Sequence, residues 1–177
     1  IPLLGIHNVR NSVAAIGVAI TVGISIRTIK KGLSSFKGVQ RRFNKIFSYN
    51  QIDYYDDYAH HPTEIKFVLD GLRNVYKDYE KICIFQPHRI SRLKDLRKEF
   101  SYSFLDADTV ILCPIFTAGE KIKLGFNYNS FAKEIIKNSK VKLFLVNNNI
   151  ELAKFLKYLS GKKIVIGMGA GTISNWM

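Results

Sequence analysis

Near the start of the chain, apolar residues recur at three- and four-residue spacing, as on one face of a helix. The spacing extends over residues 7–22 and predicts a buried helix there. A second helix is predicted over residues 26–36, with Ser25 as N-cap and Gly38 as the stop signal. Two helices alone do not make a domain, so their apolar faces need a partner elsewhere in the chain or outside it. The apolar positions of the first helix are Val9, Val13, Ile16 and Ile20.

After Gly38 the pattern changes to strands and helices in strict turn. The strand Thr109–Cys113 is apolar on both of its faces, which is typical of a parallel sheet covered by helices. We therefore predict an α/β fold, Rossmann-like and mostly parallel, with helices on both faces. Ligands of such sheets bind at the carboxyl ends of the strands. Strands are predicted at 42–49, 51–58, 81–85, 109–113, 141–146 and 163–167, and helices at 62–76, 92–104, 130–138 and 149–159.

Composition excludes disorder, because 47% of the 177 residues are hydrophobic and 23% are charged. The formal net charge of +13 raises the possibility of a nucleic-acid or anionic-surface partner. The charge is uneven, since residues 1–52 contain eight Lys and Arg and no Asp or Glu. The excess therefore lies near the front of the chain.

The two cysteines, Cys83 and Cys113, each close an apolar run and are too few for a disulfide framework. We expect buried, reduced thiols and a cytoplasmic location. The longest apolar stretch, residues 13–26, is interrupted by glycine and hydroxyl residues and is about four residues short of a spanning helix. No membrane partner is expected.

The segment 55–62 places Asp56, Asp57, His60 and His61 between a strand and the helix that begins at Pro62. These residue types suggest a metal site, but adjacent histidines point apart and no further Cys or His cluster completes four ligands. No metal site is therefore predicted here. The structural alternative is a polar turn in which a His caps the helix.

The segment 85–92 places Arg89 and Arg92 three residues apart at a predicted helix start. Two guanidinium groups together with free helix N–H groups can hold a carboxylate or a phosphate. Cations oppose the helix dipole at this position, so an anion-binding role is favoured over a solvated turn.

Three further segments carry weaker signals. Residues 167–171 read Gly-Met-Gly-Ala-Gly after the last strand, the general form of a phosphate-binding loop, but a dinucleotide fingerprint needs a longer continuation. Asn8 and Asn11 lie one helical turn apart and are suited either to capping or to contacting an adenine edge. Arg41 and Arg42 form a basic pair at the domain junction.

In this order and at these distances, the five segments resemble the Mur ligase family over essentially the whole chain. The resemblance is greatest to the branch that uses L-alanine. It implies that residues 1–38 are the last helices of the central P-loop-type ATPase domain. Residues 39–177 would be the C-terminal Rossmann-like domain, which binds the amino acid.

The resemblance implies an ATP-dependent ligase reaction in peptidoglycan synthesis. The carboxylate of UDP-N-acetylmuramate would attack the γ-phosphate of ATP, and L-alanine would displace phosphate from the acyl phosphate. Arg42 would contact the ATP phosphates and act catalytically with His60. The remaining implied contacts are Asn8 and Asn11 with adenine, Asp57 with the ribose, and His60, His88, Arg89 and Arg92 with alanine.

The chain departs from the family pattern because motifs of the central ATPase domain are absent from the 177 residues. No G-x-x-x-x-G-K-[ST] phosphate loop occurs in the 177 residues, so the Mg²⁺ ligands and most of the ATP site are expected outside them. We expect a piece of a larger enzyme that has no ligase activity alone. The alternatives are the recycling ligase of the same family that attaches a preformed tripeptide, a basic α/β module that binds nucleotides or nucleic acid, and a non-catalytic remnant.

Overall fold

The computed structural model describes residues 6–120 and 126–177 and divides the chain into two compact units, residues 1–40 and 41–177. Gly5, which opens the segment that contains Asn8 and Asn11, lies outside the described residues. Across the helices that the structure describes, none combines the length and the apolar character needed to cross a lipid bilayer.

The first unit holds two helices, α1 (Ile6–Thr21) and α2 (Ile26–Ser35). The Ser25 hydroxyl accepts a hydrogen bond from the backbone N–H of Thr28, so the predicted N-cap is confirmed. The predicted burial of α1 is wrong for this chain. Val13 is 64% exposed, and none of the described side chains of either helix is buried. Neither of the two described apolar clusters includes a side chain of these helices.

The second unit is a six-stranded sheet in the order β1-β2-β6-β3-β4-β5, in which β1 alone is antiparallel to its neighbour. The predicted α/β fold with a mostly parallel sheet is confirmed. Strand ends are in register across the sheet, since Asp57, Met168, Phe85, Leu112 and Leu145 pair in turn. The carboxyl ends of five strands therefore form one edge. The strands are β1 (Asn44–Tyr49), β2 (Ile52–Asp57), β3 (Glu80–Phe85), β4 (Thr109–Leu112), β5 (Lys142–Leu145) and β6 (Lys163–Met168).

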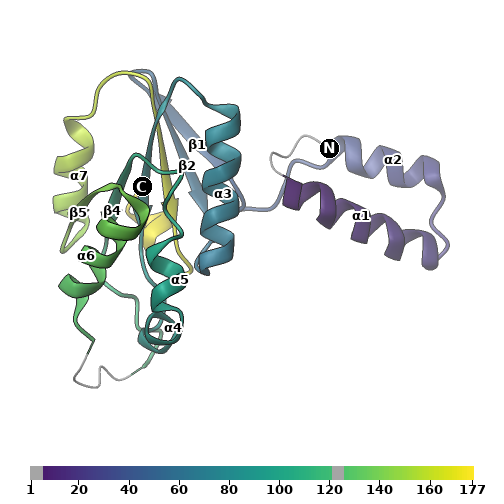
Figure 1. Cartoon of the computed structure of the whole chain (residues 1–177). Helices are drawn as coiled ribbons and strands as arrows, with labels where there is room; N and C mark the ends of the chain where they lie inside the picture. Colours follow the sequence, from purple (N-terminus) through teal and green to yellow (C-terminus); the bar gives the residue numbers. More distant parts are fainter. Residues whose placement is uncertain (1–5, 121–125) are drawn as a thin grey trace. The chain divides into compact units, whose positions relative to one another are not determined.

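Two apolar clusters, one on each face of the sheet, form the core of the second unit. Figure 1 shows the helices and strands that contribute to them. The larger cluster joins four helices to one face, and the smaller joins α7 and the final 3₁₀ turn, η1 (Ile173–Asn175), to the other. Cys83 and Cys113 are buried free thiols, one in each cluster, as predicted. The helices on the larger cluster's face are α3 (Pro62–Val75), α4 (Ile90–Asp95), α5 (Arg97–Ser101) and α6 (Tyr128–Ser139); α7 is Asn149–Lys157.

The single helix predicted over residues 92–104 is wrong, because two short helices, α4 and α5, meet at Leu96. Leu96 has φ −113° and ψ 24°, which interrupts the helical backbone. Beyond α5, the hydroxyl of Ser103 donates to the carbonyl of Glu99, a local bond that competes with helix continuation. The apolar positions on both sides of the interruption still face the core, since Leu93, Phe100 and Phe104 are all fully buried.

Candidate active site at the carboxyl edge of the sheet

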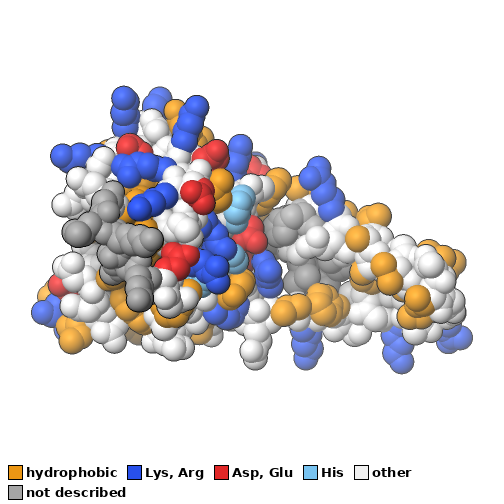
Figure 2. All heavy atoms as spheres, turned by 90° about the horizontal axis from the view of Figure 1, so that it is seen from below, with side chains coloured by type: hydrophobic (Ala, Val, Ile, Leu, Met, Phe, Trp, Pro, Cys, Tyr) orange, Lys and Arg blue, Asp and Glu red, His pale blue; other side chains and the backbone are white. Residues whose placement is uncertain are grey.

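Most of the predicted site residues of the second unit meet at the carboxyl edge of the sheet. His60 follows β2, and His88, Arg89 and Arg92 follow β3, so the edge brings two separate chain segments together. The ring centroids of His60 and His88 lie 5.8 Å apart. Figure 2 views the molecule from the side on which α4 lies in Figure 1, and His side chains are visible there among basic and acidic ones.

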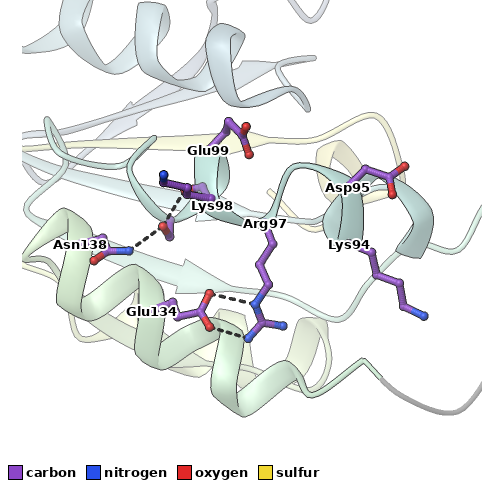
Figure 3. A pocket seen from close by; sticks show the side chains of 8 residues that line it. Lys94, Asp95, Arg97, Lys98, Glu99, Glu134 and Asn138 are labelled. Carbon is purple, nitrogen blue, oxygen red and sulfur yellow. Dashed lines mark hydrogen bonds and ion pairs between the residues drawn. The ribbon is translucent and has the colours of Figure 1, made fainter.

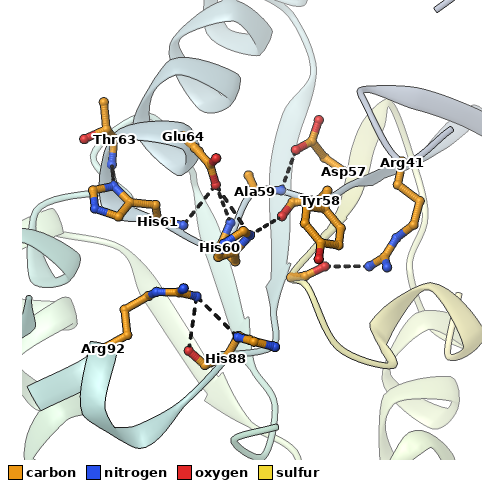
Figure 4. Close-up of polar contacts among 11 residues, drawn as sticks. Arg41, Asp57, Tyr58, Ala59, His60, His61, Thr63, Glu64, His88 and Arg92 are labelled. Carbon is orange, nitrogen blue, oxygen red and sulfur yellow. Dashed lines mark hydrogen bonds and ion pairs between the residues drawn. The ribbon is translucent and has the colours of Figure 1, made fainter. Parts of the chain in front are cut away.

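His60 is oriented by its own turn. Its Nδ1 lies 2.8 Å from the carbonyl oxygen of Tyr58, and its backbone N–H donates to Glu64 Oε2 at 2.9 Å (Figure 4). A carbonyl only accepts hydrogen bonds, so Nδ1 carries the hydrogen and Nε2 of the neutral ring is an acceptor. The Tyr58 ring packs edge-on against His60, with centroids 5.1 Å apart.

His61 has the structural role that we gave as the alternative to a metal ligand. Its Nδ1 accepts from the backbone N–H of Thr63, and Glu64 accepts from the backbone N–H of His61, which completes a capping box at the start of α3. Burial by itself raises the pKa of Glu64. The hydrogen bonds from the N–H groups of His60 and His61 and the charge of the His60 ring outweigh this effect, so the pKa of Glu64 lies below its ordinary value. Among the described residues, no group of three or more His, Cys, Asp and Glu side chains is placed to hold a metal ion.

His88 has the opposite hydrogen-bonding arrangement. Arg92 Nη1 lies 3.3 Å from His88 Nδ1 and 3.5 Å from the His88 carbonyl oxygen (Figure 4). A guanidinium only donates, so Nδ1 accepts and Nε2 carries the hydrogen of the neutral ring. Burial, and then the positive charge of Arg92, lowers the pKa of His88 below its ordinary value of 6.5. His88 therefore presents an N–H donor near neutral pH.

The start of α4 differs from the predicted anion site in two respects. Both arginines lie at a helix start, as expected, but the helix begins at Ile90 rather than at residue 92, so Arg89 is its N-cap and Arg92 its third residue. However, the backbone N–H groups of Ile90 and Ser91 already donate to Glu120 Oε2, at 2.8 and 3.1 Å. Two of the helix N–H groups that we expected to share in anion binding are therefore not free, because a carboxylate of the chain itself accepts their hydrogen bonds. The two guanidinium groups remain.

Asp57 is built into the turn that follows β2. It is 4% exposed, and its two carboxylate oxygens each accept a backbone N–H at 2.7 Å, one from Phe43 and one from Ala59. Burial raises the pKa of Asp57, and these two hydrogen bonds partly offset the rise. Asp57 thus ties the junction segment to the segment that carries His60.

The two junction arginines differ in environment. Arg41 Nη2 donates to the carbonyl of Gly169 at 2.6 Å, and Arg41 Nε lies 3.5 Å from Asp56. Arg42 is exposed, with its guanidinium carbon 5.8 Å from the centroid of the Tyr58 ring. The predicted catalytic arginine is therefore accessible to solvent beside the His60 turn, whereas Arg41 is tied to neighbouring elements.

The glycines of residues 167–171 are required by packing at the sheet edge. A Cβ on Gly171 would lie 2.5 Å from Gln86 Oε1 and 2.7 Å from Phe116 Cγ, and a Cβ on Gly169, which has φ +152°, would lie 2.7 Å from the Gln86 carbonyl oxygen. Gln86 is 3% exposed and accepts the backbone N–H of Ile173. These glycines let the last loop approach Gln86, which accounts for them without a phosphate.

Asn8 and Asn11 lie in α1, which belongs to the first unit, so their predicted contact with adenine stays a prediction. Three residues that the sequence analysis did not single out for the site do lie at this edge: Tyr58, Phe116 and Glu120. Tyr58 stood within the quoted segment 55–62 and could have been found there. Phe116 and Glu120 follow β4, far along the chain from the residues they contact, and no spacing marks them.

A second group of charged residues lies away from this edge, where α4 and α5 approach α6. Arg97 donates from Nε and Nη2 to the two oxygens of Glu134, both at 2.8 Å (Figure 3). These bonds raise the pKa of Arg97 and lower that of Glu134. The pair is bidentate and satisfied, and it fastens α5 to α6.

Comparison with known proteins gives matches over most or all of the chain. Residues 41–171 match the family model described as Mur ligase, glutamate ligase domain. The chain is 71% identical over its whole length to the UDP-N-acetylmuramate--L-alanine ligase of Pelagibacter ubique and 43% identical over 98% of its length to that of Brachyspira hyodysenteriae.

The chain spans 38% and 37% of the length of these two relatives. Among solved structures, the UDP-N-acetylmuramate-alanine ligase of Thermotoga maritima matches 98% of the chain with a TM-score of 0.79 and 27% identity, over 36% of that protein. The family model covers well over half of the chain, and so the chain belongs to the Mur ligase family.

Proposed function

We propose that this chain forms the amino-acid-binding part of an ATP-dependent ligase that joins L-alanine to UDP-N-acetylmuramate in peptidoglycan synthesis, in the cytoplasm. The observation that carries the proposal is the cluster of His60, His88, Arg89 and Arg92 at one sheet edge. The 71% identity to the Pelagibacter ubique ligase over the whole chain supports it.

The reaction has two steps. The muramoyl carboxylate attacks the γ-phosphorus of ATP, the bond to the β-phosphate breaks, and ADP leaves. The alanine nitrogen then attacks the carbonyl carbon of the acyl phosphate, a C–N bond forms, and phosphate leaves. The alanine ammonium group must lose a proton before it attacks, so the site needs a proton acceptor beside the nitrogen and cations beside the carboxylate.

The two imidazoles meet these needs in different ways. His60 Nε2 would accept a hydrogen bond or proton from the alanine nitrogen, because the Tyr58 carbonyl holds the hydrogen on Nδ1. His88 Nε2–H would donate to the alanine carboxylate, alongside Arg89 and Arg92. The opposed tautomers suit a zwitterionic amino acid.

Four residues of the chain would contact ATP. Arg42 would neutralise charge on the transferring phosphate, and its exposure at the His60 turn is consistent with a ligand that approaches from outside. Asn8 and Asn11 would contact adenine, and Asp57 the ribose, through lone pairs that its two backbone hydrogen bonds leave available.

Mg²⁺ would neutralise phosphate charge in such a reaction. The 177 residues contain no phosphate loop, so we propose that another part of the enzyme supplies the Mg²⁺ ligands.

The experiment is a graft in which this chain replaces the matched segment of the Pelagibacter ubique ligase. With ATP, Mg²⁺ and UDP-N-acetylmuramate present, phosphate release should depend on added L-alanine, and the isolated chain should release none. Release with the preformed tripeptide but not with L-alanine would instead identify the recycling activity. A graft that is folded but inactive with both, and binds nucleic acid in a salt-dependent filter assay, would support a basic binding module.

A further inference from the structure

The segment that follows β4 is attached to the segment that carries the site arginines. Phe116 N–H donates to the Pro87 carbonyl at 2.8 Å, and Arg89 N–H donates to the Phe116 carbonyl at 2.9 Å. The two hydrogen bonds form an isolated parallel bridge between His88 and Phe116. The rings of His88 and Phe116 also stack, with centroids 5.6 Å apart.

Glu120 makes the second attachment. Its Oε2 accepts the backbone N–H groups of Ile90 and Ser91, and its Oε1 accepts the Ser91 hydroxyl. The side chain of Glu120, which lies thirty residues after Ile90 in the sequence, thus accepts the hydrogen bonds of the first turn of α4. The bonds from Ser91 lower the pKa of Glu120, so it is a carboxylate at neutral pH.

Arg89, between these attachments, has an unfavourable backbone. Its φ is +67°, in the left-handed region that residues other than glycine rarely adopt. Such a conformation persists only when the surrounding structure holds it. The bridge fixes Arg89 through its own N–H, and Glu120 fixes the two residues that follow.

We propose that Glu120 is a positioning residue for the amino-acid site: through the first turn of α4 it holds the Arg89 backbone so that the guanidinium groups of Arg89 and Arg92 face the carboxylate of the amino acid. This inference rests on the proposed function. Glu120 does not itself bind that carboxylate, because like charges repel. Glu120 acts on Arg89 through the hydrogen bonds that it accepts from the backbone N–H groups of Ile90 and Ser91.

Positioning and simple electrostatics predict opposite results. The negative charge of Glu120 acts on Arg89. If that charge were all that mattered, Glu120→Ala would strengthen the binding of an anionic carboxylate. If Glu120 holds the turn, the same change weakens it. Glu120→Gln removes the charge but keeps one oxygen acceptor for the N–H groups and an amide donor for Ser91, so it should restore most of the geometry.

The test is steady-state kinetics of the grafted ligase. Glu120→Ala should raise KM for L-alanine about tenfold or more, with KM for ATP within about twofold of the unmodified graft, and Glu120→Gln should stay within about threefold. Glu134→Ala is the matched control: it removes a carboxylate that fastens α5 rather than α4, and KM for L-alanine should stay within about twofold.

A fall or no change in KM for L-alanine with Glu120→Ala would overturn the proposal, and so would an equal rise with Glu134→Ala. Amide hydrogen exchange on the isolated chain separates this failure from that of the proposed function. Glu120→Ala should accelerate exchange at Ile90 and Ser91 even if the graft proves inactive, and unchanged exchange there would also overturn the positioning role.

Discussion

The imidazole rings of His60 and His88 lie 5.8 Å apart at the carboxyl edge of the sheet, and their hydrogen-bond partners assign them opposite tautomers. A carbonyl acceptor beside Nδ1 of His60 leaves Nε2 as an acceptor. A guanidinium donor beside Nδ1 of His88 leaves Nε2 as a donor. Two residues of one type thereby offer complementary groups to a ligand that carries both an amine and a carboxylate.

The tautomers are directly measurable in the ¹⁵N-labelled chain. Near pH 7.5, imidazole ¹⁵N shifts and ring couplings should place the hydrogen of His60 on Nδ1 and that of His88 on Nε2. Arg92→Ala should remove the preference at His88, to which Arg92 donates, and leave His60 unchanged, because the Tyr58 carbonyl holds the hydrogen of His60. The same tautomer at both rings would contradict this arrangement.

The lowered pKa of His88 predicts a pH dependence of stability. Between its folded pKa and the ordinary 6.5, the unfolded chain binds a proton that the folded chain does not. The contribution of His88 to the free energy of unfolding is therefore complete above pH 6.5 and decreases as pH falls through that window. Urea unfolding from pH 5 to 7.5 should give a steeper positive slope for the unmodified chain than for His88→Gln. Equal slopes would show that His88 titrates normally.

Asp57 should be a structural residue whatever its part in nucleotide binding. Asp57→Ala leaves the buried N–H group of Ala59 and the partly buried N–H group of Phe43 without their acceptor, at about 1–3 kcal/mol for each buried group. The free energy of unfolding should therefore fall by at least the cost of one such group, about 1–3 kcal/mol. Asp106→Ala, which removes an ion pair to the half-exposed Arg73, should cost about 0–1 kcal/mol. Equal losses would contradict the structural assignment.

Gly171 should not tolerate a side chain. Gly171→Ala forces Gln86 or Phe116 to move, and overpacking of this kind costs about 1–3 kcal/mol. Gly71→Ala is the matched control in α3, where no atom lies within 4 Å of the added Cβ. It should stabilise the chain by about 0.5–1 kcal/mol, since alanine favours a helix. Thermal unfolding of the two variants should therefore shift in opposite directions, and a neutral Gly171→Ala would argue against close packing.

Much of the second unit was predictable, because its strands are apolar on both faces and its helices carry a regular apolar stripe. Pro62 and Ser25 marked helix starts correctly. The break at Leu96 was not predictable, since the same stripe runs through both short helices. The apolar face of α1 predicted burial, whereas its described side chains are exposed or half-buried.

The candidate site was predictable where residues cluster in sequence, as in the segments of His60 and of Arg89. It was not predictable where contacts join distant segments. Glu120 lies thirty residues from Ile90, so its place at the helix start could not be read from spacing. The glycines of residues 167–171 matched a phosphate-loop pattern, but their spacing also fits the close approach to Gln86 that the structure shows.

The measurement that tests the central claim most directly is the KM for L-alanine of the grafted ligase with Arg89→Ala. Loss of a charge-assisted hydrogen bond, worth about 1.5–3 kcal/mol, should raise KM about 10- to 150-fold with the fold intact. Arg73→Ala, which removes a half-exposed arginine paired with Asp106 and Asp108, should leave KM within about twofold. An unchanged KM in an active, folded Arg89→Ala graft would show that this edge does not bind the amino-acid carboxylate.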